Sequence, residues 1–278
     1  MAYKDLLVHL NNSKHRARRL DIAIRLAQAS DAHLVGLYTA TDLFAPAFLT
    51  SQLAAGLIAA QRGLFADERN KAKAEFEERG RKAGISIEWR EVEEDSGAMA
   101  TLNTRYADLA VIGQPDPDEA LSPKELDLAE RVVLDSGRPI LMVPYAGRFP
   151  TLGQRVLIAW NASAQATRAV NDALPLLAQA KAITVLAVNP RGGERGHGEV
   201  PGADIALHLA RHGLKAEAAH AFADDIDASD VILSRASDLG VDLIVMGAYG
   251  RPRLRELVLG GVTRSLFQHM TVPVLMSH

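Results

Sequence analysis

The chain repeats itself, and this repeat constrains its fold more than any other feature of the sequence. LLVHLNNS (6–13) aligns with VLIAWNAS (156–163) at an offset of 150 residues, and both are apolar runs that end in Asn-x-Ser. ADLAVIG (107–113) aligns with VDLIVMG (241–247), and RPILM (138–142) with VPVLM (272–276), both at an offset of 134. Internal similarity of this kind determines the architecture of a chain before any local pattern does.

The simplest account is two copies of one domain, about 1–145 and 153–278, joined by the linker YAGRFPTLG. The offset decreases by 16 residues (150 − 134) because the first copy is longer, chiefly between 41 and 84. Glycine, proline and threonine in the linker suit a connection between domains.

Short apolar runs alternate with segments of helical period in each copy. In the second copy the expected strands are RVLIAW, AITVLAV, LKAEAAH, DLIVMG and PVLMS, and the expected helices are 163–179, 201–212, 227–239 and 255–269. Such alternation predicts an α/β fold with a parallel sheet covered on both faces. In open sheets of this type ligands bind beyond the carboxyl ends of the strands, where the winding reverses. This rule points to WNAS after the first strand and GAYG after the fourth.

Glycines follow the fourth strand of the second copy at Gly247 and Gly250, and a helix comes after them. Unpaired backbone amides in such a turn and at the start of a helix can hold an anion. The alternative is that the glycines only permit tight turns, because glycine accepts a positive φ and close approach of neighbouring atoms.

The whole arrangement Gly247-x2-Gly250-x9-Gly260, followed by Gly-Val-Thr and closed by VPVLM, resembles the nucleotide-binding signature of the universal stress protein family. The resemblance extends to ALPLLAQAKAITVLAVNP and to the ends of both first strands, so it covers nearly all of the chain. It implies two tandem open parallel five-stranded sheets flanked by helices, of the doubly wound, adenine nucleotide alpha hydrolase-like type.

The resemblance also implies a nucleotide site in the second copy. The ligand would be ATP, with or without Mg²⁺, and AMP and ADP are the alternatives. The residues that correspond to the family's phosphate and base contacts are Ala159, Asn161, Val188, Met246, Gly247, Gly250, Arg251, Gly260, Gly261, Val262 and Thr263.

Two positions depart from the family's pattern. The residue after the third glycine, where the family has Ser or Thr, is Gly261, and the acidic residue expected after the first strand is Asn161. An amide both donates and accepts hydrogen bonds. A lost hydroxyl or charge-assisted bond nevertheless costs about 1 to 3 kcal/mol, so we expect binding weaker by one or two orders of magnitude.

The first copy departs further. At the offset of 134, Gly250 corresponds to Asp116, Gly260 to Leu126, Gly261 to Asp127 and Thr263 to Ala129. Carboxylates repel a phosphate, and bulky side chains obstruct it. We therefore predict a degenerate domain without a phosphate loop, which holds no triphosphate.

Composition excludes several classes of protein. The net charge is −3, and there is no cysteine among the 278 residues. No basic surface is available for nucleic acid or anionic lipid, and disulfide and thiolate chemistry are excluded. The N-terminal MAYKDLLVHLNN lacks the apolar core of a signal peptide, so a cytoplasmic location is expected. FAPAFLTSQLAAGLIAAQRGLF is interrupted by polar residues and predicts a helix rather than a membrane span.

Other features have two readings each. Arg251, Arg253 and Arg255 could reach phosphates or remain solvated at the helix entry. His208 and His212 have the i, i+4 spacing of zinc helices, but without a third ligand they indicate a surface pair. His9 is expected to be packed or at an interface.

Two segments are expected to carry interactions. The glycine-rich loop 189–202 is either a lid over the nucleotide or an ordinary connection. The insert 44–84 is expected to form a surface helix, and its apolar first half should be covered by the partner domain or by a second chain.

Three functions remain open. The first is an ATP-binding regulatory protein that responds to stress, in which the nucleotide acts as a conformational switch on an unknown protein partner. It would be at most a slow ATPase, because no base or metal-ligand set stands out. The second is a nucleotide-independent scaffold for interaction and dimerisation, and the third is an enzyme with the insert as a lid. We also expect the two copies to form a pseudo-dimer within the chain, which could dimerise again through the edge left by the final strand.

Overall fold

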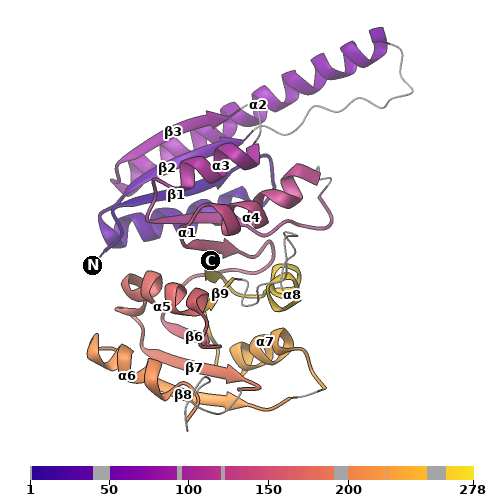
Figure 1. Cartoon of the computed structure of the whole chain (residues 1–278). Coiled ribbons are helices and arrows are strands. Elements are labelled where there is room, and N and C mark those ends of the chain that lie inside the picture. The colour runs from indigo at the N-terminus through magenta and orange to yellow at the C-terminus, as the bar shows by residue number, and fades with distance from the viewer. Residues whose placement is uncertain are drawn as a thin grey trace. The chain divides into compact units, whose positions relative to one another are not determined.

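The computed structural model of the chain describes residues 2–39, 51–92, 96–119, 123–190, 200–223, 225–248 and 261–278 (Figure 1). Contacts divide it into two compact units, which we call the N-terminal unit (Tyr3–Val132) and the C-terminal unit (Val133–His278, together with the first two residues). The sequence boundaries of the two expected domains, 1–145 and 153–278, remain a prediction. Each unit is described by itself.

The N-terminal unit is a parallel sheet with helices packed against it (Figure 1). Its elements are β1 (Asp5–Leu10), α1 (Arg16–Ser30), β2 (His33–Thr39), α2 (Ser51–Ala83), β3 (Ile87–Val92), α3 (Ser96–Thr104), β4 (Leu109–Gly113) and the greater part of α4 (Pro123–Asp135). The strand order is β3-β2-β1-β4, so the winding reverses between β1 and β4. β1 and β4 are almost fully buried, as expected for strands covered on both faces.

The C-terminal unit has the same winding. Its elements are β5 (Ile140–Val143), β6 (Arg155–Ala159), α5 (Ala164–Leu177), β7 (Ala182–Val188), α6 (Ala203–Arg211), β8 (Ala216–Ala221), α7 (Ala228–Asp238), β9 (Leu243–Gly247), α8 (Gly261–His269) and β10 (Val274–Ser277). The strand order is β5-β10-β9-β6-β7-β8, and the winding reverses between β6 and β9. The expected strands and the first three expected helices are confirmed to within a few residues, and of the expected helix 255–269 the part 261–269 is confirmed, since 255–260 lie outside the described residues. The expected α/β architecture with an open, mostly parallel sheet is correct.

The final strand β10 pairs in parallel with β9 and antiparallel with β5. In the antiparallel pair Leu141 lies opposite Leu275, which is its own counterpart at the offset of 134. The pair therefore has local twofold symmetry. The expectation that β10 leaves a free edge for another strand is wrong, because both of its sides are already hydrogen-bonded.

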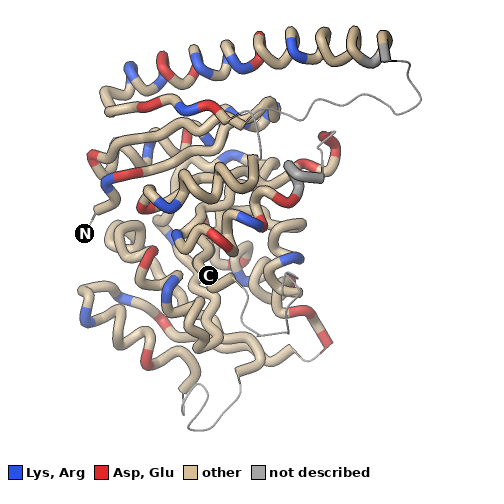
Figure 2. Tube along the Cα trace, turned by 45° about the horizontal axis from the view of Figure 1, so that its top comes forward, with Lys and Arg blue, Asp and Glu red and all other residues tan. Residues whose placement is uncertain are grey.

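Helix α2 consists of two dissimilar parts. Its C-terminal part is packed, with Phe76 buried against Gly36 of β2, where an added Cβ would lie 2.9 Å from the Phe76 ring. Its N-terminal part carries few charges (Figure 2), and Leu53 and Leu64 are 63% and 65% exposed. The expected surface helix is present, and the expectation that the partner domain or a second chain covers its apolar half stays a prediction. None of the helices in these ranges is long and apolar enough to cross a membrane.

Candidate functional site

Three neighbouring strands of the C-terminal unit end in residues that the sequence assigned to a ligand. Ala159 at the end of β6 is paired with Leu186 of β7 on one side and with Met246 of β9 on the other. Val188 lies two residues beyond Leu186, and Gly247 follows Met246. The fold therefore brings Ala159, Val188, Met246 and Gly247 together at the carboxyl edge of the sheet, beside the reversal of the winding.

Gly247 is required by the protein itself. An added Cβ would collide with the backbone nitrogen of Ala166 and would lie 2.6 Å from the carbonyl carbon of Gln165, both in the first turn of α5. Because these are backbone atoms, they cannot move aside as a flexible side chain would. The need for glycine here follows from helix packing, whether or not a ligand binds.

Asn161 shapes the loop between β6 and α5. Its Oδ1 accepts hydrogen bonds from the backbone nitrogen of Ser163 at 3.2 Å and from Ser163 Oγ at 2.7 Å. Ser163 Oγ in turn accepts from Ala166 N at 3.2 Å and caps α5. Ala162 between them has φ of 57°, a left-handed conformation that few side chains adopt. Since Oδ1 is engaged in the loop, the exposed Asn161 side chain presents its NH₂ group as a donor.

Helix α8 begins with Gly261, Val262 and Thr263. The first backbone N–H groups of an α-helix have no partner within the helix and lie at the positive end of its dipole. Gly261 is exposed, and an added Cβ would meet no atom within 4 Å. Thr263 is 3% exposed, and its assignment to a phosphate stays a prediction.

Three of the expected site residues, Gly250, Arg251 and Gly260, lie outside the described residues. The same holds for Arg253, Arg255 and most of the loop 189–202.

The equivalent edge of the N-terminal unit is filled by side chains. The strand registers match His9 with Ala159 and Thr39 with Val188. His9 Nε2 and Thr39 Oγ1 form a hydrogen bond of 2.8 Å, so a polar bridge lies where the C-terminal unit has two small or apolar residues. His9 is buried, as expected, and burial together with the nearby Arg19 lowers its pKa to about 3.

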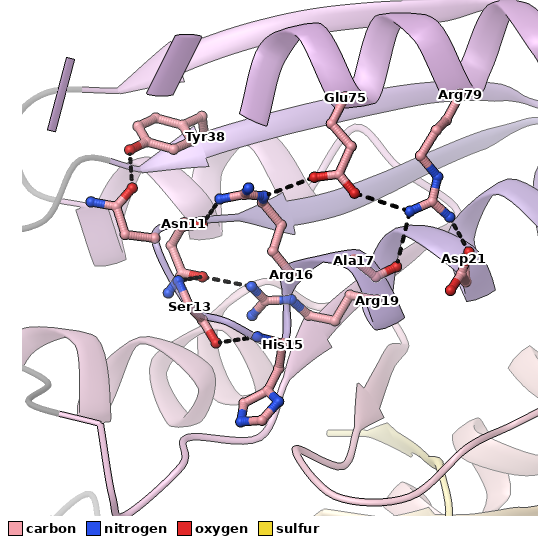
Figure 3. A network of polar contacts seen from close by, with 11 residues as sticks. Asn11, Ser13, His15, Arg16, Ala17, Arg19, Asp21, Tyr38, Glu75 and Arg79 are labelled. Atoms are coloured by element: carbon pink, nitrogen blue, oxygen red, sulfur yellow. Dashed lines mark hydrogen bonds and ion pairs between the residues drawn. The ribbon is translucent and has the colours of Figure 1, made fainter. Parts of the chain in front are cut away.

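Arg19 of α1 corresponds to Ala169 of α5, and both lie on the buried faces of their helices. The guanidinium donates through Nη2 to Asn11 Oδ1 at 2.5 Å (Figure 3). An added Cβ at Gly113, the counterpart of Gly247, would lie 2.8 Å from Arg19 Cδ. Burial lowers the pKa of Arg19 to about 10, so the group remains charged at neutral pH.

Asp116 replaces Gly250 and binds the loop before α1. Its carboxylate accepts from Lys14 Nζ and from His15 Nε2, each at 2.8 Å, and from Asp118 N at 2.9 Å. The hydrogen bonds from Lys14 and His15 hold the pKa of Asp116 well below its usual range. Glu119 accepts from Ser13 Oγ and from Lys14 N. The carboxylates of the chain thus occupy donors that an anion would otherwise use, which supports the prediction that this unit holds no triphosphate.

Among the residues that the structure describes, one group could hold a metal ion: His15, Asp116 and Glu119, whose ligand atoms lie within 4.8 Å of one another. The Lys14 ammonium already pairs with Asp116, so the cluster is an ion-pair network in this structure. The rings of His208 and His212 lie 4.8 Å apart, and neither residue belongs to such a group.

Sequence reasoning missed Arg19. A signal was present in the alignment of the two copies. At the offset of 150 residues Leu20 corresponds to Val170 and Ala23 to Ala173, and all four residues are buried. Arg19 corresponds to Ala169 in this alignment and lies on the same helix face as Leu20 and Ala23. It could therefore have been recognised as a charged residue directed into the interior.

Comparisons with known proteins agree with this description. Residues 153–278 match the model of the Universal stress protein family. A stretch of 44 residues is 43% identical to the universal stress protein MJ0577 of Methanocaldococcus jannaschii. That match covers 16% of this chain and 27% of that protein, so it spans about a quarter of the relative's length.

Several solved structures resemble the whole chain. A universal stress protein from Archaeoglobus fulgidus DSM 4304 has a TM-score of 0.66 at 15% identity, and the match covers 98% of this chain and 97% of that one. A protein of Pseudomonas aeruginosa UCBPP-PA14, described as a universal stress protein, has a TM-score of 0.61 at 17% identity, with 99% and 93% covered. At these identities the likeness shows a shared fold over both units.

Proposed function

Through its C-terminal half this chain belongs to the universal stress protein family, and from that premise we propose that it is a regulatory protein that binds an adenine nucleotide. The site lies at the carboxyl ends of β6, β7 and β9, with ATP as the first candidate and ADP or AMP as alternatives. The family match supports this proposal, as does the difference between the two units at this edge.

The observation that carries the proposal is the first turn of α8. Packing requires glycine at position 247, whereas no neighbour of Gly261 among the described residues requires it, since an added Cβ there meets none of their atoms within 4 Å. The described part of α8 starts at the exposed Gly261, and backbone N–H groups at the start of a helix suit the phosphates of a nucleotide. The counterpart of Gly261 in the N-terminal unit is Asp127, whose charge would repel them.

The other end of the site suits a base. Ala159 is small and Val188 is apolar, so a purine ring could lie against both. The NH₂ group of Asn161 could donate to a ring nitrogen of adenine, which accepts hydrogen bonds. In this proposal the amide replaces the acidic residue of the family and reverses the direction of one hydrogen bond.

The proposal assigns no catalysis to the site. Among the described residues at this edge, no carboxylate or histidine stands where it could activate water, so bound ATP would be hydrolysed slowly if at all. Binding would instead change the surface around α8 that is offered to a protein partner.

A nucleotide-independent scaffold is the alternative, and one observation favours it. Leu53 and Leu64 on the N-terminal part of α2 are largely exposed, and large exposed apolar side chains on one helix suit a protein partner. Under this alternative the C-terminal edge has no ligand.

Calorimetric titration of the full chain with ATP and Mg²⁺ tests the proposal. We expect one site per chain and at least a tenfold loss of affinity in Gly261→Asp, because the carboxylate opposes the phosphates. Gly63→Asp is the matched control: it makes the same charge change at an exposed helical glycine with open space around it, and it should bind as the parent does.

The result that rejects the proposal is an absence of binding heat at millimolar ATP together with an unchanged melting temperature. A specific ligand at 100 times its dissociation constant should stabilise the fold by about 2.7 kcal/mol. Stoichiometry of two per chain would instead contradict the assignment of an empty N-terminal unit.

A further inference from the structure

Three side chains at the carboxyl edge of the N-terminal unit could act as metal ligands. His15 lies directly before α1, and Asp116 and Glu119 follow the end of β4. One ligand atom from each of the three lies within 4.8 Å of the other two. An imidazole nitrogen and two carboxylate oxygens are ligands that zinc accepts, at about 2.0 to 2.2 Å from the ion. The fold therefore brings three zinc ligands, from two separate loops, to one point.

The spacing of these atoms is close to that around a coordinated ion. His15 Nε2 and Asp116 Oδ2 lie 2.8 Å apart. Two ligands of a tetrahedral zinc ion lie about 3.4 Å apart, given the bond lengths above. The two atoms therefore need to separate by roughly 0.6 Å to take an ion between them, which small rotations of the two side chains supply.

The carboxylates are oriented by donors that an ion would not displace. Asp116 Oδ1 accepts from Asp118 N at 2.9 Å, which leaves Oδ2 directed at His15. Glu119 Oε1 accepts from Ser13 Oγ at 3.1 Å. Ser13 Oγ in turn accepts from His15 N at 3.1 Å, so one hydroxyl links the histidine to the second carboxylate (Figure 3). Hydrogen bonds of this kind hold the ligands of metal sites in position.

The set of ligands belongs to the N-terminal unit alone. At the offsets of 150 and 134 residues the counterparts of His15, Asp116 and Glu119 are Gln165, Gly250 and Arg253. None of these counterparts is a histidine or a carboxylate. The copy that lacks the glycine loop thus has three new side chains at the same edge, and all three are suited to a cation rather than to a phosphate.

Lys14 is the competitor for this position. Its Nζ lies 2.8 Å from Asp116 Oδ2, the oxygen that also faces His15. The Lys14 side chain is 59% exposed and that of Asp116 is 3% exposed, so the ammonium can leave for solvent while the carboxylate stays. A divalent ion would bring two charges to the place where Lys14 brings one.

Two arginines limit the affinity for a cation. Zinc needs the lone pair of His15 Nε2, so the ring proton must reside on Nδ1. Arg18 Nη1 lies 3.4 Å from Nδ1 and has to move away, although a contact of this length is weak. Arg19 lines one cavity together with Glu119, and its charge also opposes a second cation. We therefore expect weaker binding than at a site whose surroundings carry no cation.

We propose that the N-terminal unit binds a zinc ion through His15 Nε2, Asp116 Oδ2 and a carboxylate oxygen of Glu119, with Lys14 displaced into solvent. Three protein ligands leave a fourth position for water. The ion would join the loop before α1 to the loop after β4. The site does not involve the candidate nucleotide residues of the C-terminal unit, so it stands or falls independently of the proposed function.

Calorimetric titration of the nucleotide-free full chain with zinc ions tests this proposal. Binding should be saturable, and His15→Gln should weaken it at least tenfold, or about 1.4 kcal/mol, by removing the nitrogen ligand. Lys14→Gln should strengthen it about threefold, because the competing ammonium is gone. His208→Gln is the matched control: it removes one member of the His208–His212 pair, leaves the cluster intact and should bind as the parent does.

Lys14→Gln retains all three ligands, so it tests the site even if His15→Gln folds poorly. Unchanged affinity in Lys14→Gln overturns the proposal, and so does a loss of binding in His208→Gln, which would place the ion at the histidine pair. Crystals of the parent chain grown with zinc give a readout that needs no variant. An anomalous peak between His15 Nε2 and Asp116 Oδ2 is expected, and a cluster without such a peak overturns the proposal.

Discussion

The two units share one fold but treat the same edge of their sheets in opposite ways. In the C-terminal unit Ala159, Val188 and Ala169 are small or apolar. In the N-terminal unit their counterparts are His9, Thr39 and Arg19. His9 bonds to Thr39, Arg19 bonds to Asn11, and these side chains fill the equivalent edge of the sheet. The two sheets have the same winding, so the units differ at this edge in their side chains and not in their strand order.

The largest expected effect separates the two strand-end glycines. Gly247→Ala should destabilise the fold by about 3 kcal/mol, because the new methyl group meets backbone atoms of α5 that cannot yield. Gly113→Ala should be milder, because its methyl group meets the end of the flexible Arg19 side chain. Denaturant unfolding without nucleotide measures both free energies of unfolding. Equal losses would show that Gly247 is not held by packing.

Acid should weaken the fold through His9, whose counterpart in the C-terminal unit, Ala159, does not titrate. Its pKa is lowered to about 3 in the folded chain, so the unfolded chain binds a proton near pH 6.5 that the folded chain does not. The stabilising contribution of neutral His9 is complete above pH 6.5 and decreases as the pH falls toward 3. Between pH 6.5 and 5 we expect a loss of about 2 kcal/mol.

Urea unfolding at several pH values measures this loss, and His9→Gln should remove most of it. His33→Gln, which changes a partly exposed histidine of the same unit, serves as the control and should retain the parent's pH dependence. A parent chain whose stability is level between pH 6.5 and 5 would contradict a buried neutral His9.

Exchange of the first-strand residues should affect binding in one unit only. Ala159→His places in the C-terminal unit the ring that fills the N-terminal crevice, and we expect at least tenfold weaker ATP binding, or about 1.4 kcal/mol. The reverse change, His9→Ala, should not create a second ATP site, because Arg19 and Asp116 remain. Calorimetric stoichiometry distinguishes these outcomes, and a second site in His9→Ala would mean that His9 alone closes the crevice.

The smallest expected effect concerns the two loop asparagines. Asn161→Ala should reduce ATP affinity about fivefold, or about 1 kcal/mol, by removing one donor to the base. Asn11→Ala should leave ATP binding unchanged and instead lower the melting temperature, because Asn11 bonds to the buried Arg19. A fall in ATP affinity in Asn11→Ala would contradict the separation of roles.

Much of the fold could be predicted because its signals are local or repeated. Buried strands such as 155–159 and 243–247 are continuous apolar runs, and the offsets between the copies align one unit with the other. The pairing of β10 on both sides could not be predicted in this way. Nothing in the sequence of VPVLM distinguishes an edge strand from a central one, since its buried residues are equally apolar in either case.

The site was predictable in part. The winding rule pointed to the ends of the first and fourth strands, and the family resemblance assigned Ala159, Val188 and Met246 to a ligand. The packing reason for Gly247 followed from neither, because its contact with α5 joins residues far apart in the sequence. The burial of Arg19 was missed because arginine is seldom buried, although its alignment with Ala169 on a buried helix face was a signal. Local patterns locate a crevice, but long-range packing determines whether it is open.

The antiparallel pair of β5 and β10 has a thermodynamic consequence. Two separate identical polypeptides could form the same Leu141–Leu275 junction only by a bimolecular reaction that dilution reverses. Within one covalent chain the two strands are tethered, so their local concentration is fixed by the connecting sequence rather than by the amount of protein in solution. Closure of this junction is thereby a property of every molecule, however rarely the molecules meet.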